Sequence, residues 1–106
     1  MMEAMAEPDG LEVSIDFSGR DPVIVLAGYV DQSTTQQLRD AITEVIERNH
    51  DRLTVDVEGV TFMDSSGIGA LATAYKRGAH VTVRHPSPTV MRELVMCGLD
   101  RLIAIN

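Results

Sequence analysis

The side chains best suited to chemistry are gathered in one stretch, Val60-Thr61-Phe62-Met63-Asp64-Ser65-Ser66-Gly67-Ile68-Gly69. It holds an acid, two adjacent hydroxyls and two glycines, at a point where a strand is expected to give way to a helix. Parallel sheets place their sites at this edge, so a serine here could accept a phosphate or contact a partner. A purely structural interpretation also stands, in which Asp64 or Ser65 caps the helix and the glycines allow close packing.

Known catalytic patterns do not account for this stretch. The chain has no Gly-x-x-x-x-Gly-Lys-Ser/Thr loop, and Ser66-Gly67-Ile68-Gly69 lacks the earlier glycine and the later acid of a dinucleotide-binding turn. Met63 or Asp64 stands where a Gly-x-Ser-x-Gly hydrolase motif has its first glycine. The three histidines (His50, His80 and His85) and the single cysteine show no metal-ligand spacing. We therefore expect no catalytic residue, no metal site and no cofactor, and we predict that the protein is not an enzyme.

Length and charge narrow the function further. The 106 residues suffice for one domain, and much of the net charge of −7 lies in residues 1–31, which hold seven acids and one base. An acidic chain with two tyrosines, two phenylalanines and no tryptophan lacks the positive field and the stacking surface that nucleic-acid binding requires. The acidic segment either keeps the protein soluble or steers it toward a basic partner.

The sequence carries no sign of a membrane or of an oxidising compartment. Its longest nearly apolar stretch, residues 23–30, is far shorter than the roughly 20 residues that a membrane-spanning helix needs. The acidic start lacks the basic-then-apolar order of a secretion signal. Cys97 is the only cysteine, and we expect it to be reduced and packed inside a helix. These features predict a cytoplasmic protein.

Hydrophobic periodicity predicts a mixed α/β domain over residues 11–106, after a flexible lead-in at residues 1–10. Strands are expected at 11–17, 23–27, 53–57, 80–84 and 102–105, and helices at about 34–48, 65–77 and 88–97. The first two strands should form a hairpin. The order ββαβαβαβ then requires right-handed crossovers and a mixed, mostly parallel sheet with the helices packed on it.

Local signals mark where these elements begin and end. Gly28 and Gly59 are expected to end the second and third strands. The first helix should begin with a capping box, either Ser33 with Gln36 or Thr34 with Gln37. Ser87 followed by Pro88 predicts the start of the third helix.

Residues 11–105 resemble the STAS domain, and within it the bacterial anti-sigma-factor antagonists. The residues of the 60–69 stretch, preceded by the strand 53–57, are close to the family signature. Val25-x-Ala27-Gly28-Tyr29-Val30-Asp31 is similar to the family's Gly-Glu-Leu/Ile-Asp element. Ser87-Pro88-x-Val90 and Cys97-Gly98-Leu99 are similar to its elements near the end of the domain.

The resemblance implies a regulatory role. Such proteins bind an anti-sigma factor that is also a serine kinase, and they thereby release the sigma factor. The kinase phosphorylates the serine directly after the Asp of the motif, which is Ser65 here, and a phosphatase reverses the modification. Asp31 matches a family Asp that lies near this serine. We expect the partner-binding surface to comprise Asp31, Ser33, Thr34, Asp64, Ser66, Gly67 and Ile68 around Ser65, because the first two helices both begin at strand ends.

The sequence departs from the family pattern in three places, and it leaves two alternative functions open. Tyr29 replaces the usual Glu, which would slow phosphorylation if that acid positions the kinase. The second helix is expected to be about one turn short, and the sequence stops at Asn106, where relatives usually add a helix, so weak homodimerisation is a hypothesis. One alternative is a STAS regulatory subunit of a transport or stress-signalling complex without a phosphoswitch. The other is a fragment of a dehydrogenase-like fold.

Overall fold

The computed structural model describes residues 10–106, so nearly all of the predicted lead-in lies outside the described residues. Its first two strands, β1 (Leu11–Asp16) and β2 (Val23–Val30), form the expected antiparallel hairpin. Val13 lies opposite Leu26 and Ile15 opposite Ile24, so the apolar residues of both strands face the same side of the sheet. The alternation read from the sequence thus sets the register of the hairpin.

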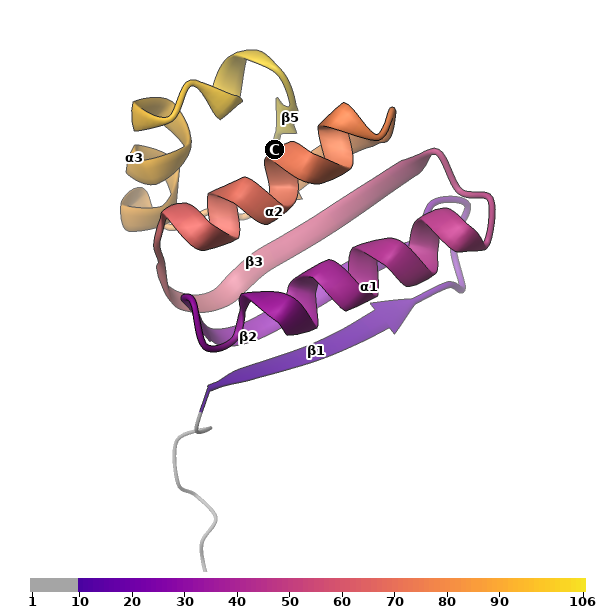
Figure 1. Ribbon diagram of the computed structural model, residues 1–106, viewed down its shortest axis with the longest axis horizontal. Helices are drawn as coiled ribbons and strands as arrows, with labels where there is room; N and C mark the ends of the chain where they lie inside the picture. Colours follow the sequence, from indigo (N-terminus) through magenta and orange to yellow (C-terminus); the bar gives the residue numbers. More distant parts are fainter. Residues whose placement is uncertain (1–9) are drawn as a thin grey trace, which may run out of the picture.

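The remaining elements confirm a mixed, mostly parallel α/β sheet. They follow as α1 (Thr35–Glu47), β3 (Arg52–Met63), α2 (Ser65–Lys76), β4 (His80–Arg84), α3 (Pro88–Met96) and β5 (Ala104–Ile105). The five strands lie in the order β1-β2-β3-β4-β5, and every pair after the hairpin is parallel. Helices α1 and α2 lie side by side across one face of this sheet, and α3 packs beside α2 and β3 (Figure 1).

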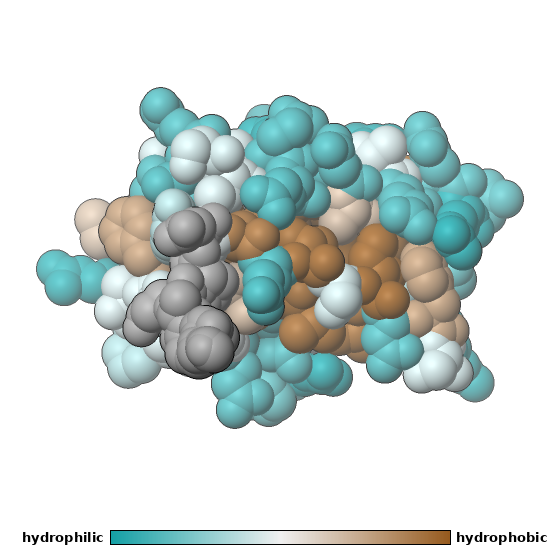
Figure 2. Space-filling model, turned by 90° about the horizontal axis from the view of Figure 1, so that it is seen from below, coloured by the Kyte–Doolittle hydropathy of each residue, from teal (hydrophilic) through white to brown (hydrophobic). Residues whose placement is uncertain are grey.

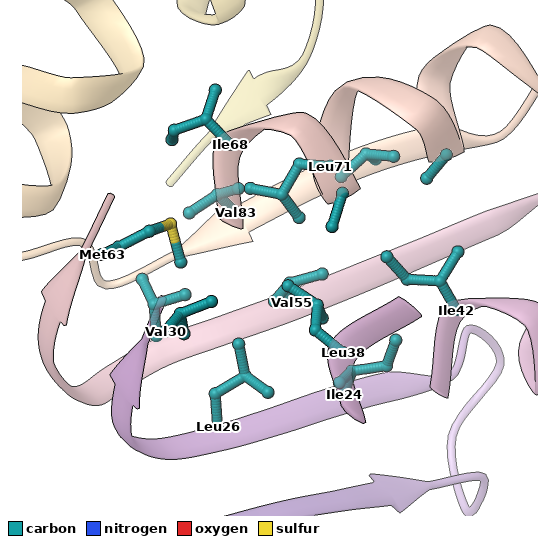
Figure 3. Packing of buried hydrophobic residues seen from close by; sticks show 14 of the residues in the cluster. Ile24, Leu26, Val30, Leu38, Ile42, Val55, Met63, Ile68, Leu71 and Val83 are labelled. Atoms are coloured by element: carbon teal, nitrogen blue, oxygen red, sulfur yellow. The ribbon is translucent and has the colours of Figure 1, made fainter. Parts of the chain in front are cut away.

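One apolar cluster between the sheet and the helices holds the domain together (Figure 3). Its fully buried side chains come from every layer and include Ile24, Leu26, Val30, Leu38, Val55, Met63, Leu71, Val83 and Leu94. Burying one such side chain contributes roughly 1.5–3 kcal/mol of transfer free energy. Among residues 10–106 no helix is long and apolar enough to span a membrane.

Two strands are longer than predicted because glycine does not end them. β3 runs through Gly59 to Met63, and β2 runs through Gly28 to Val30. The pairing between them shifts register twice, so β3 carries two bulges where it passes β2. A Cβ on Gly59 would lie 3.0 Å from the Leu26 carbonyl oxygen, and one on Gly28 (φ 117°) would collide with Gly10. These glycines allow close backbone approach, and the prediction that they break the strands is wrong.

Several predicted ends are also wrong. β5 is reduced to two residues because Leu99–Arg101 forms a 3₁₀ turn. Cys97 follows the last residue of α3 and is exposed, so it is not packed inside the helix. Neither capping box forms at α1, because the Thr34 side chain makes no cap hydrogen bond. The predicted start of α3 is confirmed, since Ser87 Oγ accepts a hydrogen bond from Val90 N at 3.2 Å.

Candidate functional site

Two turns that carry an Asp and a Ser meet at one edge of the sheet. β2 ends at Val30 and β3 at Met63, and these residues are partners in the parallel ladder. Asp31 and Asp64 follow directly, and Asp64 N donates a hydrogen bond to the Val30 carbonyl oxygen at 3.1 Å. The carboxyl ends of adjacent parallel strands thus bring both turns together, as the sequence predicts.

The Asp64 turn separates the two neighbouring serines. Asp64 is the N-cap of α2, and its Oδ1 accepts hydrogen bonds from Ser66 N at 2.9 Å and from Ser66 Oγ at 2.5 Å. Ser66 is half-buried and its hydroxyl is occupied. Ser65 is exposed, and within residues 10–106 its hydroxyl makes no hydrogen bond. Of the two hydroxyls, that of Ser65 is therefore the one available for chemistry.

The Asp31 turn is built in the same way. Asp31 Oδ1 accepts hydrogen bonds from Ser33 N at 2.8 Å and from Ser33 Oγ at 2.7 Å. The Ser33 hydroxyl is the main cause that holds the pKa of Asp31 below its ordinary value, although partial desolvation opposes it. This carboxylate is therefore negative at neutral pH, next to the start of α1.

Two threonines at the start of α1 fix the turns, and sequence reasoning found only one of them. Thr34 Oγ1 donates to the Tyr29 carbonyl oxygen at 2.9 Å and accepts from Asp31 N at 3.0 Å. Thr35 Oγ1 donates to the Ser66 carbonyl oxygen at 3.1 Å, which joins the starts of α1 and α2. No sequence signal could identify Thr35, because its partner lies 31 positions away in another turn.

Three residues expected on the binding surface are buried. Thr34 and Ile68 are each 4% exposed, and Gly67 is buried as well. A Cβ on Gly67 would lie 2.7 Å from Val30 Cγ1 and 2.8 Å from Met63 Cγ, so only glycine lets α2 approach the sheet this closely. The expectation that these three residues line the surface is corrected: they support the turns from beneath, while Asp31, Ser33, Asp64, Ser65 and Ser66 reach solvent.

An exposed aromatic residue beside the site was missed. Phe62 is 47% exposed, and its partner in the ladder with β2 is Tyr29, which is half-buried. The available signal was strand alternation, because Met63 is buried and its neighbour must then point to the other face. Phe62 and Tyr29 together give the sheet face next to the two turns an apolar component.

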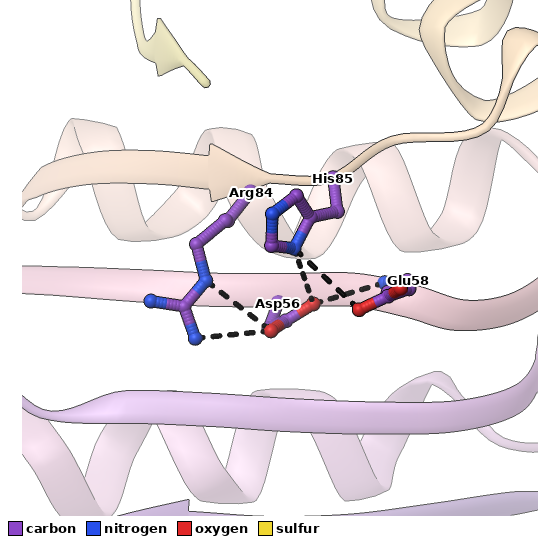
Figure 4. Close-up of polar contacts among 4 residues, drawn as sticks. All are labelled: Asp56, Glu58, Arg84 and His85. Carbon is purple, nitrogen blue, oxygen red and sulfur yellow. Dashed lines mark hydrogen bonds and ion pairs between the residues drawn. The ribbon is translucent and has the colours of Figure 1, made fainter.

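The sheet face that α1 and α2 leave uncovered carries a separate ionic cluster (Figure 4). Arg84 Nη2 lies 3.0 Å from Asp56 Oδ2, and His85 Nδ1 lies 3.7 Å from Asp56 Oδ1 and 3.6 Å from Glu58 Oε1. Burial is the largest influence on Asp56 and raises its pKa, but hydrogen bonds from Glu58 N–H and Arg84, with the charges of Arg84 and His85, together lower it.

These side chains include a group that sequence spacing hid. Asp56, Glu58 and His85 are close enough to share a metal ion, although the sequence showed no metal-ligand spacing. Arg84 already supplies a positive charge to Asp56, and both His85 and Glu58 are exposed. We therefore interpret the cluster as an ion-pair network on the sheet surface.

The comparisons with known proteins agree with the fold. Residues 13–104 match the family described as Mlab, STAS domain. The chain belongs to the STAS domain family. This STAS domain is 31% identical over 88 residues to the anti-sigma F factor antagonist of Paenibacillus polymyxa, which covers 78% of this chain and 75% of that protein. It is 33% identical over 101 residues to the anti-sigma-F factor antagonist RsfB of Mycobacterium tuberculosis, covering 92% and 82%. Neither name is that of an enzyme, in agreement with the prediction for this chain.

Solved structures share the architecture of this STAS domain. An anti-sigma factor antagonist from Mycobacterium paratuberculosis matches with a TM-score of 0.85 at 24% identity, over 94% of this chain and 88% of that one. The anti-sigma factor antagonist SpoIIAA in its unphosphorylated form matches with a TM-score of 0.72 at 25% identity, over 90% and 88%. The Bacillus SpoIIAA in its phosphorylated form matches with a TM-score of 0.69 at 24% identity, over 90% and 91%.

Proposed function

We propose that this STAS domain is an anti-sigma-factor antagonist whose binding is ended by phosphorylation of Ser65. Its partner would be an anti-sigma factor that is also a serine kinase, and a phosphatase would restore binding. The observation that carries the proposal is the contrast between the two serines: the Ser65 hydroxyl is exposed and unbonded within the described residues, whereas Asp64 occupies that of Ser66. The names of the two relatives and the phosphorylated form of SpoIIAA support it.

The electrostatics of the turn suit a charge switch. A phosphoserine adds about −1.5 to −2 charges at neutral pH. At the start of α2 the helix dipole would favour this charge by roughly 0.3–1 kcal/mol, while the carboxylates of Asp64 and Asp31 would repel it. The domain itself can accept the modification because Ser65 faces solvent. A partner surface docked over it would lose its fit through repulsion and through the cost of burying the phosphate.

The contact surface would consist of the exposed residues of both turns. Asp31, Ser33, Asp64, Ser65 and Ser66 would meet the partner directly, and Phe62 would add apolar area beside them. Tyr29 stands where the resembled proteins have a Glu, so we expect Ser65 to be phosphorylated more slowly than in the variant Tyr29→Glu.

The two neighbouring serines provide the test. Binding of the purified anti-sigma factor kinase would be measured by calorimetry for the wild type and for Ser65→Ala, Ser65→Glu and Ser66→Ala. We expect Ser65→Ala to bind like the wild type and to resist phosphorylation, and Ser65→Glu to bind at least about 100-fold more weakly, because burying an unpaired charge in an interface costs several kcal/mol. Ser66→Ala should still be phosphorylated at position 65.

The outcome that would reject the proposal is equally specific. Mass spectrometry that mapped the phosphate to Ser66 alone would contradict it, as would equal affinity of the phosphorylated and unphosphorylated forms. The alternative, a STAS regulatory subunit of a transport or stress-signalling complex, predicts that Ser65→Glu leaves partner binding unchanged.

A further inference from the structure

A shallow apolar groove runs along the outer strand of the sheet. β1 lies at the end of the strand order, and within residues 10–106 no strand pairs with its other edge. Val13, Ile15 and Phe17 face the helix side but are only partly buried, because α1 does not reach over them completely. Together with Ala41 and the flank of α1 they line a groove of about 460 Å³.

Acidic side chains lie on both faces of the sheet along this strand. Asp40 and Glu44 of α1 form one wall of the groove, whereas Glu12 and Asp16 project from β1 on the opposite face of the sheet. Hydrogen bonds from the side chain and backbone N–H of Ser18 hold the pKa of Asp16 below its ordinary value. Figure 2, which views the molecule from below relative to Figure 1, shows an apolar stripe across the middle, with hydrophilic residues above and below it.

The guanidinium of Arg48, which contacts two residues of the groove, is already engaged. Arg48 lies 2.9 Å from Glu44 Oε2, and its guanidinium carbon lies 4.5 Å from the centre of the Phe17 ring. Arg48 shows which side chain suits this surface: its stem covers an apolar ring while its head meets a carboxylate. The rest of the groove also places an apolar side chain, Val13, near a carboxylate, Asp40, but no lysine or arginine lines it.

We propose that the groove binds an extended, basic segment of a partner protein, which adds to the free edge of β1 as a further strand. Backbone hydrogen bonds to β1 would supply affinity, and alternate side chains would supply specificity. Lysine or arginine side chains facing α1 would cover Val13 and Ile15 and place their charges near Asp40, next to the Arg48–Glu44 pair. On the opposite face, basic residues would pair with Glu12 and Asp16 across the strands.

Charge argues against a second copy of this chain as the occupant. An antiparallel pair of two β1 strands would bring Glu12 and Asp16 of one copy beside the same carboxylates of the other. Like charges opposite each other destabilise strand pairing. The acidic side chains of β1 therefore favour a basic partner over a homodimer through this edge.

The proposal can be tested with defined peptides and backbone NMR. The probe is a blocked seven-residue peptide in which lysine or arginine alternates with valine, and the control peptide has glutamate at every basic position. We expect the basic peptide to shift the amide resonances of residues 12–17 saturably, and the acidic one to leave them unchanged. Methylating alternate backbone nitrogens of the basic peptide should weaken binding at least about tenfold, because strand addition needs those donors.

Matched charge variants complete the design. Asp40→Lys with Glu44→Lys should weaken binding of the basic peptide at least about tenfold. Asp51→Lys with Glu93→Lys makes the same change in net charge away from the groove and should have little effect, as should Ser65→Glu, because this surface does not depend on the serine switch. Absence of saturable shifts, equal binding of the acidic or methylated peptide, or concentration-dependent shifts of residues 12–17 without peptide would overturn the proposal.

Discussion

The two turns at the sheet edge use the same local chemistry with different results. In each, an Asp carboxylate oxygen accepts hydrogen bonds from the backbone N–H and the hydroxyl of the serine two positions later: Asp31 from Ser33, and Asp64 from Ser66. The difference is where the helix starts. α2 begins at Ser65, directly after its Asp, whereas α1 begins at Thr35, four residues after its Asp.

The residue between each Asp and its bonded serine decides whether a free hydroxyl is present: it is Ser65 in one turn and Gln32 in the other. Ser65 is the first residue of α2, with its side chain in solvent and no partner within the described residues. Asp16 and Ser18 repeat the same pair of hydrogen bonds in the β1–β2 loop, where no helix follows. The Asp-x-Ser turn alone is therefore a local structural motif, and a serine at its middle position, at the start of a helix, distinguishes the proposed switch from its two copies.

The largest expected difference concerns the third residue after each Asp, which is Thr34 in one turn and Gly67 in the other. Gly67→Ala should lower the free energy of unfolding by about 1–3 kcal/mol, because its Cβ would crowd Val30 and Met63 in the core. Gly69→Ala is the matched control in the same helix: its Cβ would meet only Arg39, at 3.6 Å, so it should be neutral or stabilise by up to about 1 kcal/mol. Urea unfolding measures both, and equal effects would show that α2 does not depend on the close approach.

The two aspartates should also differ in their contribution to stability. Asp64→Ala removes a helix cap and should cost about 0.5–2 kcal/mol. Asp31→Ala should cost less, because its carboxylate bonds Ser33 N, which precedes the first residue of α1, whereas the carboxylate of Asp64 bonds an N–H inside α2. Thermal unfolding of the two variants side by side is the measurement. A greater loss in Asp31→Ala would mean that its side chain, and not its backbone, organises the start of α1.

The smallest effect is a pH dependence at the Asp31 turn. Because hydrogen bonds hold the pKa of Asp31 below its unfolded value, its stabilising contribution is present above about pH 4 and is lost as the pH falls through the lower, folded pKa. Ser33→Ala should move the pKa of Asp31 back toward its ordinary value, as seen by NMR titration of the carboxyl carbon. The stability difference between wild type and variant should shrink on acidification, and a difference that grew instead would reverse the assigned cause.

The sequence was informative wherever a signal is local. Alternation in 11–17 predicted the hairpin, the three- and four-residue spacing of Leu38, Ala41 and Val45 predicted α1, and the residue types at Asp64 and Ser87 predicted two caps. The sequence was misleading where packing or the exact end of an element determines the structure. Gly59 was predicted to end a strand, yet it allows β2 to approach closely. Cys97 was predicted to pack inside a helix, yet α3 ends just before it and its side chain is exposed.

The candidate site shows the same division. Asp31, Ser33 and the 64–66 turn could be placed together because adjacent parallel strands end at one edge. The burial of Ile68 and Gly67, and the hydrogen bond from Thr35 to Ser66, depend on how α1 and α2 pack on the sheet and on each other. Such packing cannot be inferred from the residue types alone, so these features could be found only in the three-dimensional structure.

The two bulges of β3 have a consequence for how this strand can evolve. Each places one additional residue in β3 relative to β2 and absorbs it locally, so that Val60 after the first bulge and Met63 after the second both point into the core as Val55 does. Deleting one residue at a bulge would restore regular pairing and leave the 64–66 turn on the same side, whereas deleting one residue from the regular part before the bulges would reverse inside and outside there. Single-residue changes in the length of this strand should therefore be tolerated at the two bulges and not before them.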